Sequence, residues 1–305
     1  LVLEGRASVN SQVTSSFRSF DYVGAMLSTA ALVSFLLIMT FGYRIGWGSP
    51  AVVTGIGVVI GLFGAFIFWE RRVHDPMIPL ELFHRPQFVL GASANFVSFM
   101  ASTALFFLMP FFLQEVKGYS PGESGLILVA PGICMAVIGP IAGRLSDRLG
   151  SRRFAVAGLA ISVSAFLLFS RLDGSSPLLL IVIGLLLAGT GNALFFSPNS
   201  SSILGSVERE RYGVATAFLN LIRNAGNITG LAIATTIVTM TMASMGFEPS
   251  LAAVTGGGNN GVVHAFATGL NYAFLLSALM GTLALIMSAI KLKAASPSVT
   301  ETIVS

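Results

Sequence analysis

Long apolar runs that alternate with short polar segments most constrain the fold of this 305-residue chain. A helix of about 20 apolar residues is long enough to cross the hydrocarbon core of a bilayer, which is about 30 Å thick. The runs of this kind are residues 22–43, 51–69, 88–113, 124–142, 154–170, 177–203, 213–244 and 264–290. We therefore predict an all-α, polytopic membrane protein with eight transmembrane helices.

The composition agrees with this prediction and excludes other classes. Hydrophobic residues make up 54% of the chain and charged residues only 10%, whereas soluble domains contain about 25% charged residues. The net charge of +4 does not indicate a nucleic-acid partner, because the basic residues are scattered through the turns and form no stripe. The single cysteine, Cys134, excludes an internal disulfide, and the three histidines stand in separate links, so we expect no metal site and no cofactor.

Polar segments divide the chain into five predicted parts. Residues 1–21 form a cytoplasmic linker, 22–69 a pair of transmembrane helices, 70–87 a cytoplasmic connection, 88–290 a six-helix bundle, and 291–305 a cytoplasmic tail. The connection is charged and contains three prolines, which forbid a continuous helix. The chain begins at a leucine, with no cleavable signal before the first apolar run, so we interpret it as a piece of a longer chain.

The basic residues predict the orientation in the membrane, because Lys and Arg in short loops stay on the cytoplasmic side. With eight spans, one side would hold only Arg44, Lys117 and Arg171. The other side would hold Arg6, Arg18, Arg71, Arg72, Arg85, Arg144, Arg148, Arg152, Arg153, Arg209, Arg211, Lys291 and Lys293. We expect both termini to be cytoplasmic and the protein to lie in a cell membrane, the inner membrane of a bacterium.

The densest group of charges lies in residues 143–153, G-R-L-S-D-R-L-G-S-R-R, between two apolar runs. A glycine at position 150 permits a tight turn, because positive φ is inexpensive there. We predict a water-exposed loop that either only anchors the topology or has a further role. The residues of this loop that we single out are Gly143, Arg144, Asp147, Arg148, Gly150, Arg152 and Arg153.

One apolar run carries a charge within the membrane. Asn220, Arg223 and Asn227 are spaced i, i+3, i+7 and share one helix face, with Asn224 at its edge. A charge inside a span costs about 2.5–3.5 kcal/mol on insertion scales, so it normally faces a partner or a wet cavity. The alternative is that Arg223 snorkels to the cytoplasmic surface.

Other polar side chains recur within the apolar runs. Asn95, Ser98 and Ser102 share a face, Asn192 and Asn199 share another, and Asn271 stands alone. These groups could contact a ligand or could form hydrogen bonds between helices. Phe106, Phe107, Met109, Phe111 and Phe112 could form an apolar wall or face lipid and core. The acidic residues all fall in links or at the ends of runs, so the chain has no evident proton relay of its own.

Four motifs follow one another along the chain: residues 75–83 (D-P-M-I-P-L-E-L-F), 114–121 (Q-E-V-K-G-Y-S-P), 143–153, and 220–230 (N-L-I-R-N-A-G-N-I-T-G). Together they resemble the fourteen-helix drug:proton antiporter branch of the major facilitator superfamily. The resemblance implies that residues 22–69 are two inserted central helices and that 88–290 are the carboxy-terminal six-helix half. It also implies that the first six helices are absent. The loop residues singled out above would then be gating residues, with Asp147 closing a cytoplasmic gate against the missing half.

We therefore expect part of a proton-coupled efflux antiporter for drugs or other amphipathic small molecules. Its partners would be the lipid bilayer, the substrate, protons and the missing amino-terminal six-helix half. The alternative is a non-transporting membrane scaffold, or a half-bundle that is active only with another subunit. An enzyme is not expected, because no nucleophile with a base, phosphate-binding loop or metal cluster is present in the sequence.

Overall fold

The computed structural model describes residues 21–73, 86–205, 207, 212–255 and 260–290. Within these ranges it contains helices and turns but no strand, and eight helices are long and apolar enough to cross a membrane. The predicted all-α membrane fold is therefore confirmed. Residues 1–20 of the linker, 74–85 of the connection and the tail 291–305 lie outside the described residues, as do Arg209 and Arg211.

The helices begin and end within about one turn of the predicted apolar runs, except at the end of α4. The elements in chain order are α1 (Tyr22–Ile45), α2 (Pro50–Glu70), α3 (Pro86–Phe111), the π-helical turn η2 (Phe112–Val116), α4 (Pro121–Leu149), α5 (Ser151–Phe169), α6 (Leu178–Gly205), α7 (Tyr212–Ser244), α8 (Ala252–Thr255) and α9 (Asn260–Ala289). The segment 245–263, which falls between the last two predicted apolar runs, thus contains α8 and the first turn of α9.

Local sequence explains where several helices start. Ser120 and Glu123 form a capping box at the start of α4: the Ser120 backbone N–H donates to Glu123 Oε2 at 2.8 Å, and Ser120 Oγ accepts from the Glu123 backbone N–H at 3.3 Å. Asp21 caps α1 by accepting from the Gly24 backbone N–H at 2.8 Å. Proline follows the N-cap residue in α2 and α4. Its missing N–H costs no hydrogen bond there, because the first N–H groups of a helix have no partner within the helix.

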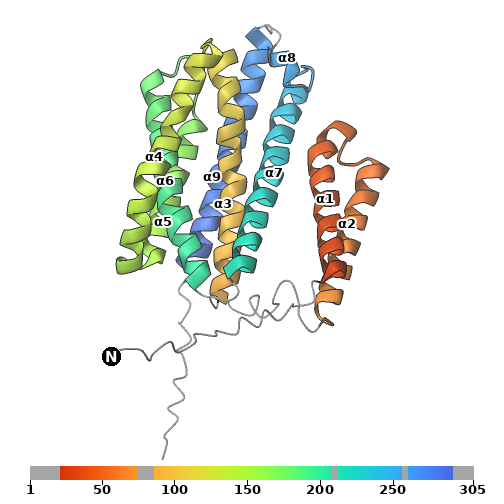
Figure 1. Ribbon diagram of the computed structural model, residues 1–305. Coiled ribbons are helices and arrows are strands. Elements are labelled where there is room, and N and C mark those ends of the chain that lie inside the picture. The colour runs from red at the N-terminus through yellow and green to blue at the C-terminus, as the bar shows by residue number, and fades with distance from the viewer. Residues whose placement is uncertain (1–20, 74–85, 206, 208–211, 256–259, 291–305) are drawn as a thin grey trace, which may run out of the picture.

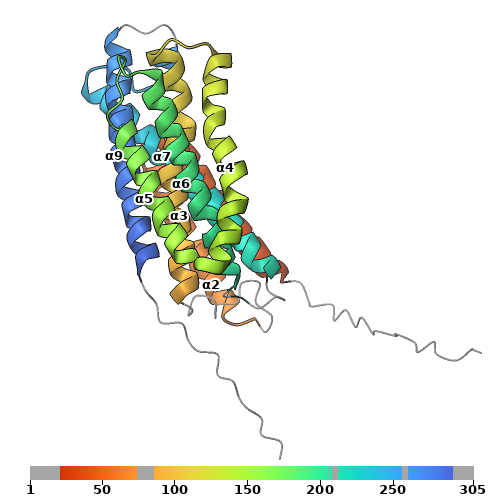
Figure 2. The same cartoon turned by 90° about the vertical axis from the view of Figure 1, so that its left-hand side faces the viewer.

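Six helices, α3 to α7 and α9, form one bundle (Figures 1 and 2). Its core includes Phe166, Phe169 and Phe274, which are at most 1% exposed, and the rings of Phe169 and Phe274 lie 5.2 Å apart. Glycine permits the close approach of α5 and α6, because a Cβ on Gly158 would lie 2.6 Å from the carbonyl oxygen of Gly191. Small residues at such contacts are what brings helices together in a membrane.

The α1–α2 hairpin stands beside this bundle, next to α7 (Figure 1). At one end of the hairpin, Trp69 Nε1 donates to both carboxylate oxygens of Asp21, at 3.1 and 3.2 Å. At the other end, Trp47 Nε1 donates to Thr236 Oγ1 of α7 at 3.1 Å. Glu70, which we placed in the surface connection, is the last residue of α2 and is only 2% exposed.

The prediction that residues 143–153 form a loop is wrong in extent. α4 continues as a helix to Leu149 and α5 begins at Ser151, so only Gly150 interrupts the two helices, with φ +92°. The reason is length: at about 1.5 Å per residue, the 29 residues of α4 span about 44 Å, well beyond the hydrocarbon core of about 30 Å. The charged end of α4 therefore extends out of the membrane as a helix.

Candidate functional site

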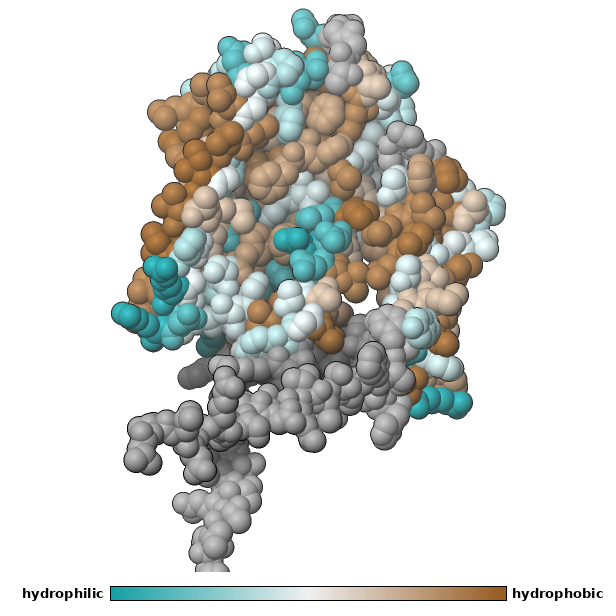
Figure 3. Space-filling view, viewed as in Figure 1, coloured by the Kyte–Doolittle hydropathy of each residue, from teal (hydrophilic) through white to brown (hydrophobic). Residues whose placement is uncertain are grey.

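A polar cavity opens between α3, α4, α6 and α7. Its volume is about 290 Å³, near the lower end of the roughly 300–1,000 Å³ of ligand pockets. Figure 3 shows a hydrophilic patch at mid-height on the face formed by α3 and α7, bordered by apolar surface. The residues that line the cavity are Asn95, Phe99, Ser102, Phe106, Met135, Asn192, Phe196, Ser200, Leu219, Asn220, Arg223 and Asn227.

α7 contributes the charged side of the cavity. Asn220, Arg223 and Asn227 all line it, as expected for residues on one helix face. The side chains of Asn220 and Arg223 are exposed, whereas Asn227 is partly buried and its Oδ1 accepts a hydrogen bond from Thr103 Oγ1 of α3 at 3.1 Å. Asn224 is exposed and is not among the lining residues. The guanidinium of Arg223 therefore supplies the cavity with hydrogen-bond donors and with a positive charge.

α3 and α6 contribute buried amides and hydroxyls. Asn192, only 1% exposed, accepts from Ser102 Oγ at 3.2 Å and from Ser162 Oγ of α5 at 3.5 Å, so it is held between three helices. Asn95 is 3% exposed, and its Oδ1 has no hydrogen-bond partner within the described part of the chain. Ser98 is equally buried but does not line the cavity.

Aromatic side chains form the apolar side of the cavity. The rings of Phe99 and Phe196 stack with their centroids 4.2 Å apart and an interplanar angle of 10°. Of the apolar wall suggested by the sequence, only Phe106 lines the cavity, while Met109 and Phe112 are fully buried in the core of the bundle. Sequence reasoning missed Phe99, although it lies four residues after Asn95 and so shares its helix face.

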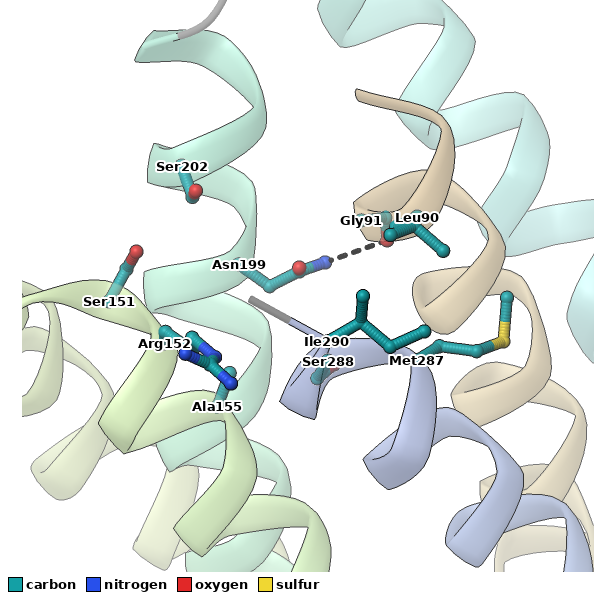
Figure 4. A pocket seen from close by; sticks show the side chains of 10 residues that line it. All are labelled: Leu90, Gly91, Ser151, Arg152, Ala155, Asn199, Ser202, Met287, Ser288 and Ile290. Carbon is teal, nitrogen blue, oxygen red and sulfur yellow. Dashed lines mark hydrogen bonds between the residues drawn. The ribbon is translucent and has the colours of Figure 1, made fainter. Parts of the chain in front are cut away.

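Asn199 lies in a second pocket of about 180 Å³, where α3, α5, α6 and the end of α9 meet (Figure 4). Asn199 Nδ2 donates to the backbone carbonyl of Gly91 at 3.2 Å. Arg152, at the start of α5, points into this pocket, and its Nη2 donates to the backbone carbonyl of Ala289. Asn271 lines neither pocket, and its buried Oδ1 has no hydrogen-bond partner among the described residues.

The candidate gating residues lie around the turn between α4 and α5. Arg144, Asp147, Arg148, Arg152 and Arg153 are exposed, and Asp147 forms no ion pair within the part of the chain that the structure describes. The backbone at Gly143 approaches α6: a Cβ there would lie 2.7 Å from Ser197 Oγ. Charged side chains at the lower end of α4 form a second hydrophilic area in Figure 3.

The described ranges contain no group of three or more His, Cys, Asp or Glu side chains that could hold a metal ion. Among the described residues that line the cavity of Arg223 there is no Asp, Glu or His. The arrangement can therefore hold a molecule by hydrogen bonds, a positive charge and aromatic contacts. It offers no nucleophile paired with a base.

In the part of the chain that the structure describes, eight helices are long and apolar enough to cross a membrane, and four helices of the six-helix bundle line a cavity with polar groups. These features define a multi-pass membrane protein of the kind that moves small molecules. Residues 91–302 match the Major Facilitator Superfamily, and the chain belongs to that family. The predicted family membership is thereby confirmed. Its relatives are transporters and not enzymes.

Three relatives indicate the range of names within the family. Lincomycin resistance protein LmrB of Listeria monocytogenes is 27% identical over 272 residues, which cover 88% of this chain and 56% of that protein. Riboflavin transporter RibZ of Clostridioides difficile is 31% identical over 215 residues, covering 70% and 46%. Multidrug resistance protein Stp of Mycobacterium tuberculosis is 30% identical over 218 residues, covering 71% and 40%. The chain spans about half the length of these relatives.

Proposed function

We propose that this chain supplies one wall of the substrate cavity, and part of the inner gate, of a proton-coupled efflux antiporter for drugs or other amphipathic small molecules. The observation that carries the proposal is the cavity in which Arg223 of α7 lies with asparagines and a stacked phenylalanine pair. The resistance proteins among the relatives support the same class of cargo.

The chemistry of the cavity suits an amphipathic molecule. The guanidinium of Arg223 presents several N–H donors in one plane, which favours cargo with a carboxylate, phosphate or clustered oxygen atoms. Asn95 and Asn220 add amide groups that can donate or accept. Phe99, Phe196 and Phe106 offer apolar surface to a planar ring.

Proton coupling would come from outside this cavity wall. Because none of the described residues that line the cavity is an Asp, Glu or His, we propose that the coupling groups belong to an amino-terminal six-helix half. Transporters of this design work by rocking two bundles about a site between them. In this arrangement α1 and α2 would be the two inserted central helices.

The turn between α4 and α5 would form part of the inner gate. We propose that the exposed carboxylate of Asp147 pairs with a group on the opposite half when the carrier closes at its inner side. Gly143, Gly150 and the four arginines would then position this end of α4. The many basic residues at this end suggest that both termini are cytoplasmic and that the membrane is a bacterial inner membrane.

The experiment compares proteoliposomes that hold this chain alone with proteoliposomes that also hold an amino-terminal six-helix half. Substrate-dependent proton flux is measured with an internal pH dye, using a planar amphipathic dye as substrate. Flux that requires both halves supports the proposal. Flux from the chain alone contradicts the division into halves, and no flux from the assembled pair favours a non-transporting scaffold.

A further inference from the structure

A separate crevice lies between the α1–α2 hairpin and the bundle. It consists of two adjoining pockets of about 320 and 770 Å³, which share Thr235 and Leu251. The inner pocket is lined by Met39, Thr40, Phe41, Phe107, Ile228, Leu231, Ala232, Thr235 and Leu251. The outer pocket is lined by Gly46, Trp47, Gly48, Thr235, Thr236, Thr239, Met240, Ala243, Pro249, Ser250, Leu251 and Ala252.

This crevice differs chemically from the cavity of Arg223. None of the described residues that line it carries a charged side chain. Two of its threonines have hydroxyls that are bonded within the protein: Thr239 Oγ1 donates to the Thr235 carbonyl at 2.9 Å, and Thr236 Oγ1 accepts from Trp47 Nε1 at 3.1 Å. The lining of the crevice therefore suits an uncharged ligand that makes few hydrogen bonds.

The crevice and the cavity lie on opposite sides of the contact between α3 and α7. Phe106 lines the cavity and Phe107 the crevice, and likewise Asn227 lines the cavity and Ile228 the crevice. The two helices approach closely at this contact, because a Cβ on Gly226 would lie 2.8 Å from the Phe96 carbonyl oxygen. A molecule in the crevice is thus separated from the cavity by packed backbone.

The position of the crevice along membrane-spanning helices indicates which molecule would occupy it. The crevice runs along membrane-spanning parts of α1 and α7, at the side of the bundle, where the adjacent solvent is lipid hydrocarbon. The inner pocket is lined mainly by apolar side chains, and such cavities stay dry because water needs polar partners. At its outer end the crevice reaches the Trp47 turn, and tryptophan is enriched at the level of the lipid headgroups.

We propose that this crevice is a binding site for an acyl chain of a bilayer phospholipid. The chain lies against Met39, Ile228 and Leu231, and the glycerol end lies near Trp47 and Ser250. The lipid fills the space between the hairpin and α7 and joins the two parts. The site depends only on the chain spanning the membrane, so it stands or falls independently of the transport activity.

The test uses proteoliposomes of this chain with a phospholipid that carries a photoreactive diazirine on one acyl chain. After illumination, mass spectrometry maps the adducts. The proposal expects adducts at the crevice residues of α1 and α7 several-fold above those on the lipid-facing side of α4, which includes Leu126 and Ile133. Adducts spread evenly over all exposed apolar faces would overturn it.

Two further arms sharpen the test. Ala243→Phe fills the outer pocket and is expected to reduce the crevice adducts several-fold, while Ala157→Phe on the exposed face of α5 leaves them unchanged. In the unsubstituted protein, excess ethidium is expected to leave the adducts in place. Displacement by ethidium would instead make the crevice a binding site for cargo and would contradict the lipid assignment.

Discussion

Arg223 has two possible roles, and its surroundings distinguish between them. It lies 11 positions after the first residue of α7, or about 17 Å along the helix axis, which is far from the end of the helix. Its side chain lines a cavity shared with α3, α4 and α6 rather than only lipid. This environment favours a role in the cavity over simple snorkelling.

Replacing Arg223 with leucine is expected to lower transport by the assembled carrier about 10- to 100-fold, because a hydrogen bond to a charged group contributes about 1.5–3 kcal/mol. Arg223→Lys keeps the charge but not the planar donors, so it should retain an intermediate rate. Asn224→Leu is the matched control, since Asn224 is exposed on the same helix outside the cavity. Dye efflux rates measure all three, and full transport by Arg223→Leu would contradict the proposed role.

Asp173 gives a pH-dependent prediction at the opposite end of the bundle, between α5 and α6. Its Oδ1 accepts from Ser175 Oγ at 2.7 Å and Ser176 Oγ at 3.0 Å, and these bonds hold the pKa of the carboxyl below its ordinary value of 3.8. A depressed pKa means stabilisation that is present above the unfolded pKa and is lost as the pH falls through the folded pKa.

Acidification from about pH 5 to pH 3 should therefore lower the melting temperature of the unsubstituted protein more than that of Asp173→Asn. Thermal unfolding in detergent at several pH values measures the difference. Equal acid sensitivity of the two proteins would show that the Ser175 and Ser176 hydrogen bonds do not stabilise the fold.

At the scale of elements, two glycines with different surroundings test how the helices pack. A Cβ on Gly158 would meet backbone atoms of α6, including Phe195 N at 2.8 Å, whereas nothing lies within 4 Å of a Cβ on Gly132. Gly158→Ala should destabilise the protein by about 1–3 kcal/mol, because α5 and α6 must separate. Gly132→Ala should be neutral or stabilise by up to about 1 kcal/mol, because alanine suits a helix better. Unfolding in denaturing detergent measures both, and equal effects would refute the close contact.

The α1–α2 hairpin provides a second test of element packing. Trp47→Phe removes the bond to Thr236, a net loss of about 0.5–1.5 kcal/mol, and should loosen the hairpin from α7. Trp69→Phe removes a bond within the hairpin, so the hairpin should stay in place. Spin labels at Ile60 and Leu126 in a Cys134→Ala background report the distance between hairpin and bundle. The distance distribution should broaden only for Trp47→Phe; an unchanged width there would contradict the tether.

For the whole molecule, hydropathy and charge are sufficient to predict the number of membrane helices, because bilayer thickness sets their length. They do not predict where α4 ends, since its charged last turns are helical outside the hydrocarbon core. The helical period also predicts which face of a helix a residue lies on, but not which pocket it reaches. Asn192 and Asn199 share a face of α6, yet they lie about 10 Å apart along its axis and line different pockets. Which of the 24 phenylalanines face inward depends on helix rotation, and Phe196, like Phe99, could have been found only from its spacing of four residues from a candidate asparagine, here Asn192.

The orientation of these helices is the claim on which the cavity and gate depend. Single cysteines replace Arg148, Lys117 or Arg171 in a Cys134→Ala background, and a membrane-impermeant maleimide is added to intact cells and to permeabilised cells. We predict that Lys117→Cys and Arg171→Cys react in intact cells and that Arg148→Cys reacts only after permeabilisation. Reaction of Arg148→Cys and Lys117→Cys from the same side would contradict the account.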